Sequence, residues 1–322
     1  MAATETKIFD PNDPATGTGG AELLDSTVVL RGNQWHMFLA GQAHQAGAPQ
    51  LFSATLPPGE PLSATGWQLR RYVSGELIPL TPPSAPGAWD SDGGRHCPAY
   101  VRGFDPHTSR EVERIYYAGG AEFLWGPYTI GFLECDGSVW QPQPEPVFRA
   151  TQDWEHGSVF EPNLIYDDGK WRMWYVCGSH HENYLAHGYT ESLDGRTWSA
   201  PTLFAPLEMQ MFDFCVRPRG QSFHAIFSRI ASGNPPSPQA GLWHCRAEAP
   251  HGDLSQWSTP AQIMTAEDRG WHSGPFKPSF AFDEPNPDRA FIFFDGTYNT
   301  GGGGPFPFAF TLGCLEIEIP LS

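Results

Sequence analysis

The sequence predicts an all-β fold, a five-bladed β-propeller with four antiparallel strands in each blade. One local pattern occurs five times: a polar residue, in most copies before a proline, then an apolar run, a tight turn and an aromatic-rich strand. The copies start at positions 25, 97, 161, 217 and 277, in steps of 72, 64, 56 and 60 residues. Four-stranded units of this length that repeat around an axis form propeller blades.

The composition agrees with this fold and excludes some partners. The 322 residues include 35 Gly and 32 Pro, and 14% are aromatic, as expected for short packed strands joined by turns. The formal charge of −17 argues against nucleic acid and against an anionic membrane surface as partners, because both attract basic proteins. The charge does not identify a substrate, because net charge bears mainly on solubility. The partner that we expect is a small-molecule, possibly anionic, substrate.

Each repeat contains a clear second strand and a closing segment. The second strands are aromatic and β-branched and end in small residues; they span 35–41, 114–120, 171–178, 223–229 and 290–296. The closing segments of the first four repeats end in a tryptophan that should fill the space between neighbouring sheets: Trp67, Trp140, Trp198 and Trp257. The fifth repeat ends in an alternating strand, 315–319, without a tryptophan.

We expect one domain whose five blades span 21–80, 89–148, 154–207, 211–265 and 270–322. Residues 1–20 are expected to form a lead-in segment. The N-terminus has no apolar core or basic start, so we predict no signal peptide and a cytoplasmic location. No apolar run approaches the roughly 20 residues of a membrane span.

The six cysteines lack the spacing of a metal or disulfide framework. They lie one per strand-like segment, without a C-x-x-C pair, and are expected to be reduced and mostly buried. We therefore expect no set of metal ligands and no cofactor. A structural calcium ion in the channel is the one alternative to this expectation.

The first residue of each repeat should point toward the propeller axis. The innermost strand of a blade runs along the central channel, and proline is tolerated at the start of such an edge strand. Pro98, Pro162, Pro218 and Pro278 hold the preceding residue in an extended direction. The predicted axial residues are therefore Asp25, Cys97, Glu161, Arg217 and Lys277.

Asp13 is an alternative to Asp25 in the first blade. The residues after Asp13, 15–19, cannot form the apolar strand that the pattern requires, whereas residues 28–30 after Asp25 can. We therefore favour Asp25.

At this point the chain resembles the five-bladed propeller glycoside hydrolases, the group that contains families 32, 43, 62, 68 and 130. Asp25 is similar to the first-blade carboxylate of that group, and residues 160–164 are similar to its third-blade glutamate segment. The resemblance implies that Asp25 is nucleophile or base and Glu161 general acid, since glycosidic cleavage uses two carboxyl groups. The second-blade aspartate of the group is replaced here by Cys97.

The replacement at Cys97 removes a carboxylate that would hold sugar hydroxyls or tune the acid. Asp213 could substitute, as could one of three other acidic residues: Asp90, Asp92 or Glu155. Cys97 is expected to fill a gap. A nucleophilic pair with His96 is disfavoured, because adjacent residues on a strand point to opposite faces.

Several further residues are expected to bind substrate. Arg217 and Lys277 favour a ligand with a carboxylate or phosphate, or else pair with Glu161 and Asp25 across the channel. His96, His156 and His272 are expected near the rim of the channel as proton carriers or hydrogen-bonding residues. The expected platforms for stacking on a sugar ring are Trp89, Trp154, Trp271 and Tyr298.

Three functions fit the sequence. The first is a glycoside hydrolase-like enzyme that acts on a small glycoside or sugar derivative through Asp25 and Glu161. The second is a non-hydrolytic small-molecule enzyme on the same scaffold, such as a cyclase, lyase or isomerase, which the loss of the second-blade carboxylate favours. The third is a sugar-binding propeller without catalysis, because a fold does not fix a function.

Overall fold

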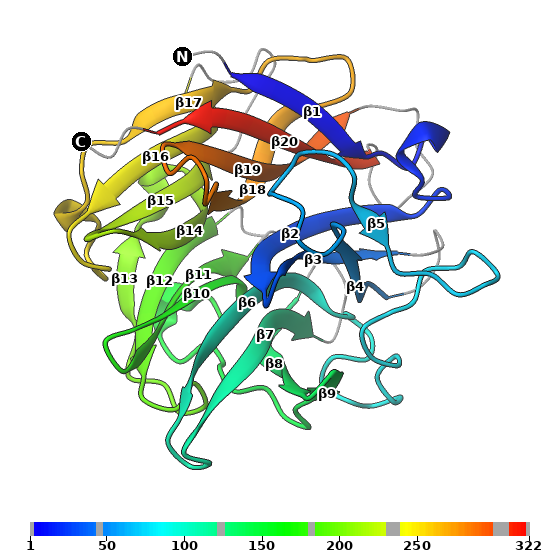
Figure 1. The fold of residues 1–322 in the computed structure, drawn as a ribbon. Helices are drawn as coiled ribbons and strands as arrows, with labels where there is room; N and C mark the ends of the chain where they lie inside the picture. Colours follow the sequence, from blue (N-terminus) through cyan, green and yellow to red (C-terminus); the bar gives the residue numbers. More distant parts are fainter. Residues whose placement is uncertain are drawn as a thin grey trace.

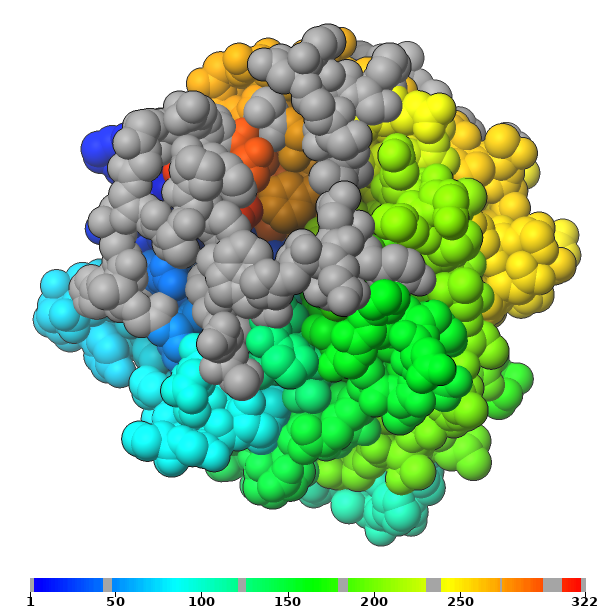
Figure 2. Space-filling view, turned by 180° about the vertical axis from the view of Figure 1, so that it is seen from behind, coloured from blue at the N-terminus to red at the C-terminus, as the bar shows by residue number. Residues whose placement is uncertain are grey.

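The computed structural model describes residues 3–42, 48–120, 126–179, 184–229, 239–298 and 309–319. They form five four-stranded antiparallel sheets arranged around a central axis (Figure 1). The all-β, five-bladed propeller predicted from the repeat is confirmed. Seen from the opposite side, the blades follow one another around the molecule in chain order (Figure 2).

The first three blades are built from consecutive strands. Blade 1 consists of β2 (Glu22–Arg31), β3 (Gln34–Gln42), β4 (Gln50–Thr55) and β5 (Gln68–Leu69). Blade 2 consists of β6 (His96–Asp105), β7 (Arg110–Gly120), β8 (Tyr128–Asp136) and β9 (Val139–Pro142). Blade 3 consists of β10 (Val159–Asp167), β11 (Lys170–Ser179), β12 (Tyr184–Ser192) and β13 (Thr202–Ala205).

The last two blades differ in how they close. Blade 4 again uses consecutive strands: β14 (Met211–Arg219), β15 (Ser222–Arg229), β16 (Gly241–Ala247) and β17 (Ala261–Thr265). Blade 5 contains β18 (Ser273–Phe282), β19 (Arg289–Tyr298) and β20 (Ala309–Glu318), and its outer strand is β1 (Thr4–Phe9). Short 3-10 helices span Pro14–Thr16, Asp153–Glu155, Leu207–Met209 and Leu254–Gln256.

Residues 1–20 were expected to form only a lead-in segment, but residues Thr4–Phe9 form strand β1 of the fifth blade. It pairs antiparallel with β20, from Thr4 opposite Glu316 to Phe9 opposite Leu312. The fifth blade is thus completed by the other end of the chain, which explains why residues 315–319 alternate but lack a closing tryptophan. This pairing joins the two ends of the ring and covers an edge that would otherwise be exposed.

The closing tryptophans fill the spaces between blades, as predicted. Trp140 of blade 2 packs edge-on against Phe38 of blade 1, with ring centroids 5.4 Å apart. The other three also contact the preceding blade: Trp67 against Phe293, Trp198 against Tyr116, and Trp257 against Trp174. Aromatic packing of this kind fixes each blade against its neighbour.

All six cysteines are free thiols, and all but Cys135 are buried. Within the part of the chain that the structure describes, no helix is long and apolar enough to cross a membrane. The five innermost strands, β2, β6, β10, β14 and β18, each contact the next around the axis (Figure 1). The start of these strands is therefore where side chains from all five blades can meet.

Candidate functional site

Each innermost strand has the same backbone irregularity near its start. The pairing with the second strand is interrupted by a bulge after Leu24, His96, Phe160, Phe212 and Phe276. The next residue always has a positive φ, between 49° and 60°: Asp25, Cys97, Glu161, Asp213 and Lys277. A left-handed conformation is costly for residues other than glycine, so its fivefold recurrence at one position makes these residues the candidate functional site. We call these five residues the axial ring.

The fourth axial residue is Asp213 and not Arg217. Arg217 lies four residues further along β14, opposite His224, and its guanidinium donates to the carbonyl of Val216. Pro218 caused the error, because the Arg217–Pro218 pair imitates the axial motif while it lies near the hairpin turn at the other end of the strand.

Proline follows the axial residue in three blades for a geometric reason. Pro98, Pro162 and Pro278 occupy the second position of a bulge, where the regular pairing is interrupted. A residue without a backbone N–H is tolerated there. Ser26 and Phe214 occupy the same place in blades 1 and 4, so the bulge and not the proline defines the site.

Lys277 is the cation of the axial ring. Its Nζ forms an ion pair with Glu161 Oε2 and lies 3.5 Å from Asp213 Oδ1. Asp213 also accepts a hydrogen bond from the backbone N–H of Lys277 at 2.8 Å. Lys277 thus joins blades 3, 4 and 5. Of the two alternatives for Lys277, a ligand with a negative group or a partner across the channel, the structure shows the second, with Glu161 as the partner.

Asp25 has a different set of partners. Its Oδ2 accepts a hydrogen bond from the backbone N–H of Cys97 at 3.0 Å, and its own N–H donates to Asp295 Oδ2 at 2.7 Å. Among the described residues, no basic side chain forms an ion pair with Asp25, which is only 4% exposed. Asp25 is therefore a buried carboxyl group beside other acids.

These contacts separate the charge states of the two carboxyl groups. Burial raises the pKa of Asp25 to about 6, aided by the charge of Glu161. Burial would also raise the pKa of Glu161, but the charge of Lys277 and hydrogen bonds from Lys277 and Cys97 outweigh it and lower that pKa. Glu161 is thus held as a carboxylate, whereas Asp25 can carry a proton near neutral pH.

Two further buried acids next to this pair have raised pKa values. Burial raises the pKa of Asp213 well above its usual value, despite the opposing charge of Lys277. Burial and the charge of Asp25 do the same to the pKa of Asp295. For Lys277 the cost of burial is outweighed by Glu161 and Asp213, and its pKa is raised. The site therefore contains a close ion pair, between Lys277 and Glu161, and three buried carboxyl groups with raised pKa values, those of Asp25, Asp213 and Asp295.

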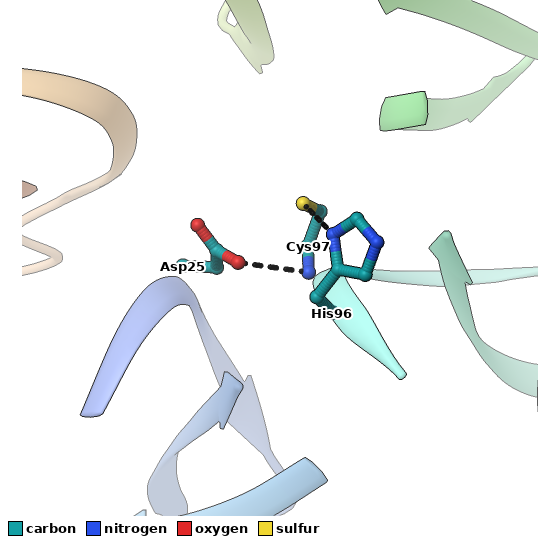
Figure 3. Close-up of side chains that lie close together, drawn as sticks. All are labelled: Asp25, His96 and Cys97. Atoms are coloured by element: carbon teal, nitrogen blue, oxygen red, sulfur yellow. Dashed lines mark hydrogen bonds between the residues drawn. The ribbon is translucent and has the colours of Figure 1, made fainter. Parts of the chain in front are cut away.

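His96 and Cys97 lie side by side, contrary to the expectation for adjacent strand residues. His96 Nδ1 is 2.8 Å from Cys97 Sγ, and the bulge with φ 55° at Cys97 explains why both side chains reach the same place. Figure 3 shows them converging with Asp25 from the neighbouring blade. One ligand atom from each of these three residues lies within 4.8 Å of the other two.

Two residues of this region were not predicted. Asp295 follows the apolar run of β19, and an acidic residue directly after such a run could have been predicted to lie near the site. His187 lies on β12, is 1% exposed, and has no hydrogen-bond partner at either ring nitrogen among the described residues. Burial lowers the pKa of His187 to about 3, and the charges of Glu161 and Lys277 also act on it. No pattern in the sequence separated His187 from other strand histidines.

Other expected site residues have packing or capping positions. His272 is fully buried, and its Nε2 lies 3.1 Å from Glu5 Oε2 of β1. His156 is exposed and ends the 3-10 helix Asp153–Glu155. Glu155 accepts hydrogen bonds from the N–H groups of residues 151 and 152, and Asp90 is paired with Arg95 at 2.7 Å. Four acids were considered as replacements for the second-blade carboxylate that Cys97 removes. Asp213 is the one of them that belongs to the axial ring.

The three tryptophans that were expected to stack on a sugar ring are half-buried and pack against other side chains of the protein. Trp89 stacks on Tyr117 with centroids 5.4 Å apart, and Trp271 packs edge-on against His272 at 4.2 Å. Trp154 packs against the core of blades 2 and 3. Tyr298 was also expected as a stacking platform, but its side chain is not among those that the structure describes.

Known proteins share this architecture at low sequence identity. No protein-family model matches the chain, and no curated protein sequence matches it. The catalytic domain of a family 62 α-L-arabinofuranosidase from Coprinopsis cinerea superposes with a TM-score of 0.65 at 12% identity, covering 97% of this chain and 95% of that one. A family 117 glycoside hydrolase from Zobellia galactanivorans gives a TM-score of 0.63 at 12% identity, covering 99% and 91%.

An exo-1,5-α-L-arabinanase from a bovine ruminal metagenomic library is also similar, with a TM-score of 0.59 at 15% identity, covering 93% of this chain and 94% of that one. The resemblance to five-bladed propeller glycoside hydrolases is thus confirmed for the fold.

Proposed function

We propose that this protein is a glycoside hydrolase-like enzyme that acts on a small glycoside or sugar derivative at the axial ring. The observation that carries the proposal is the ion pair between Lys277 and Glu161, beside a buried Asp25 that lacks a cationic partner among the described residues. Cleavage of a glycosidic bond needs one protonated and one ionised carboxyl group, and the raised pKa of Asp25 beside the lowered pKa of Glu161 supports such a pair.

The resemblance implies that Asp25 is the nucleophile or base and Glu161 the general acid. The pKa shifts of these two carboxyl groups favour the opposite assignment. Lys277 keeps Glu161 ionised, which suits a base or nucleophile and not a proton donor. Asp25 is the better donor to the leaving oxygen, because burial keeps its carboxyl group partly protonated near neutral pH. In this assignment Asp25 protonates the leaving group, while Glu161 attacks the anomeric carbon or activates water.

A panel of aryl glycosides separates the two roles. An acid is needed little when the leaving group is already good, so Asp25→Asn should hydrolyse dinitrophenyl glycosides nearly as fast as the wild type. The same variant should lose about 100-fold or more with poorer leaving groups. Glu161→Ala should be impaired with all of them, and azide should restore turnover. Glu145→Gln changes an exposed carboxylate and serves as the control.

Two results would contradict this account. The opposite pattern, with the leaving-group dependence in the Glu161 variant, would restore the conventional roles. Unchanged turnover in both variants would remove the axial ring from the reaction.

The second candidate, a non-hydrolytic enzyme for a small molecule, is favoured by one feature of the axial ring. Cys97 occupies the second-blade axial position, and the Cys97 thiol cannot stabilise positive charge on a sugar ring as a carboxylate does. This candidate predicts no hydrolysis of any glycoside in the panel, together with saturable binding of a small molecule that Glu161→Gln weakens.

A further inference from the structure

We propose that Asp25, His96 and Cys97 form a binding site for a thiophilic divalent cation such as Zn²⁺. The site brings together a carboxylate oxygen, an imidazole nitrogen and a thiol sulfur from two neighbouring blades (Figure 3). The proposal goes beyond the proposed function, which concerns the metal-free protein.

The geometry is close to that of a three-ligand zinc site. Zinc binds sulfur at about 2.3 Å and nitrogen or oxygen at about 2.0–2.2 Å, so its ligand atoms lie about 3–4 Å from one another. Here the three candidate ligand atoms lie within 4.8 Å of one another, with His96 Nδ1 and Cys97 Sγ 2.8 Å apart. The 2.8 Å separation is shorter than the spacing in a zinc site, so the imidazole and the thiol have to move apart slightly when an ion binds.

The backbone presets this arrangement. Asp25 and Cys97 both have a positive φ, and the N–H of Cys97 donates to Asp25 Oδ2, which fixes the carboxylate against the neighbouring blade. His96 packs edge-on against Tyr128 with centroids 4.7 Å apart, which holds the ring in place. All three residues are at most 8% exposed, so the surrounding side chains limit how far the three ligands can move.

The donor set selects the class of metal. Sulfur and imidazole ligands favour Zn²⁺ and other late transition metals over Ca²⁺ and Mg²⁺, which require oxygen ligands. Three protein ligands leave a fourth position for water or another oxygen donor. The positive charge of Lys277 does not oppose the ion strongly, because it is already paired with Glu161.

A bound ion would compete with the proposed reaction. On binding, Cys97 releases its proton to solvent and both Cys97 and Asp25 coordinate as anions. Asp25 can then no longer deliver a proton to a leaving group. If the proposed function holds, Zn²⁺ is therefore expected to be an inhibitor whose effect a chelator reverses.

The test measures metal binding directly and does not depend on turnover. Zn²⁺ is titrated calorimetrically into full-length protein that carries Cys135→Ser, which removes the half-buried thiol outside the site. We expect one ion per chain, and with Co²⁺ a thiolate-to-metal charge-transfer band. Cys97→Ser should weaken Zn²⁺ more than about tenfold and abolish the band, and His96→Gln should also weaken binding. Cys177→Ser, which changes a buried thiol on β11, is the matched control.

The outcomes decide the two proposals separately. Absence of stoichiometric binding, or equal binding by folded Cys97→Ser protein, overturns the metal site whatever the enzyme does. A thermal shift with Zn²⁺ in the wild type, absent in Cys97→Ser, supports the site even if calorimetry of the variant is limited by stability. Turnover of the aryl glycosides by the wild type in the presence of a chelator reports on the proposed function alone, because no Zn²⁺ is then bound.

Discussion

At the scale of single residues, Lys277 determines the charge balance of the axial ring. It is 6% exposed and neutralises a carboxylate that is itself 8% exposed, so little solvent screens the pair. A buried pair contributes little compared with an apolar replacement of both partners, but removal of one partner leaves an isolated buried charge. Glu161 would then lose the interaction that keeps it ionised.

The first prediction concerns this lysine. Lys277→Met should destabilise the protein by about 3–5 kcal/mol, because it leaves the Glu161 carboxylate without its cation. The free energy of unfolding in urea gives the value. Lys170→Met is the control, since the side chains of Lys170 and its partner Glu191 are 43% and 28% exposed; it should cost less than about 1 kcal/mol. Equal losses in the two variants would contradict the buried pair.

At the scale of elements, β1 closes the propeller. Its Ile8 and Phe9 are buried in the core shared by blades 1 and 5, and Glu5 contacts Arg269 and His272. The ring therefore depends on a strand that is distant in sequence from its partner β20.

Deletion of residues 1–9 should destabilise the protein by about 3–6 kcal/mol, the contribution of burying two large apolar side chains. It also exposes the edge of β20, so the truncated protein should aggregate more readily. Deletion of residues 1–3 is the control and should change little. Thermal melts with light scattering measure both effects, and a truncated protein as stable as the full chain would refute the closing role.

A pair of histidines on β15 and β16 predicts acid sensitivity. His224 Nδ1 and His244 Nε2 are 3.0 Å apart, and Ser222 lies at the other nitrogen of His224. Burial, with smaller contributions from the charges of Arg219 and Arg246, lowers both pKa values to about 4, and the charge of His224 contributes to the shift at His244. Because the unfolded chain binds these protons more readily, stability is full above about pH 6.5 and falls as the pH drops toward 4.

The expected loss between pH 7 and pH 4.5 is roughly 1–3 kcal/mol from this pair. His244→Gln keeps a hydrogen-bonding group and removes one titrating site, so its stability should vary less steeply with pH. Urea unfolding at several pH values measures the slope. A slope identical to that of the wild type would show that the pair does not contribute.

At the scale of the whole molecule, the repeat predicted the architecture because each blade carries its own strand and turn signals. The axial ring was predicted at four of five positions, since proline marks the bulge in blades 2, 3 and 5 and Asp25 precedes an apolar run. Blade 4 was misread because Phe214 follows Asp213, and a proline occurs later in the same strand.

Other features could not be read from the sequence because they depend on contacts between distant strands. The pairing of β1 with β20 joins the two ends of the chain. For the ion pair of Lys277 with Glu161, the sequence offered only a general alternative, pairing across the channel, because the choice of partner depends on how blades 5 and 3 meet at the axis. The contact of His96 with Cys97 requires a left-handed residue that a regular strand would not contain.

The central claim is that the axial ring is where a glycoside reacts. A crystal structure of the Glu161→Gln variant, soaked with a glycoside that the wild type cleaves, tests it most directly. We predict density for the sugar at the axial ring, with its glycosidic oxygen in hydrogen-bonding distance of Asp25 and its anomeric carbon facing residue 161. A sugar bound away from the axial ring, for example in the surface groove beside Trp198, with the ring unoccupied by the ligand, would contradict the account.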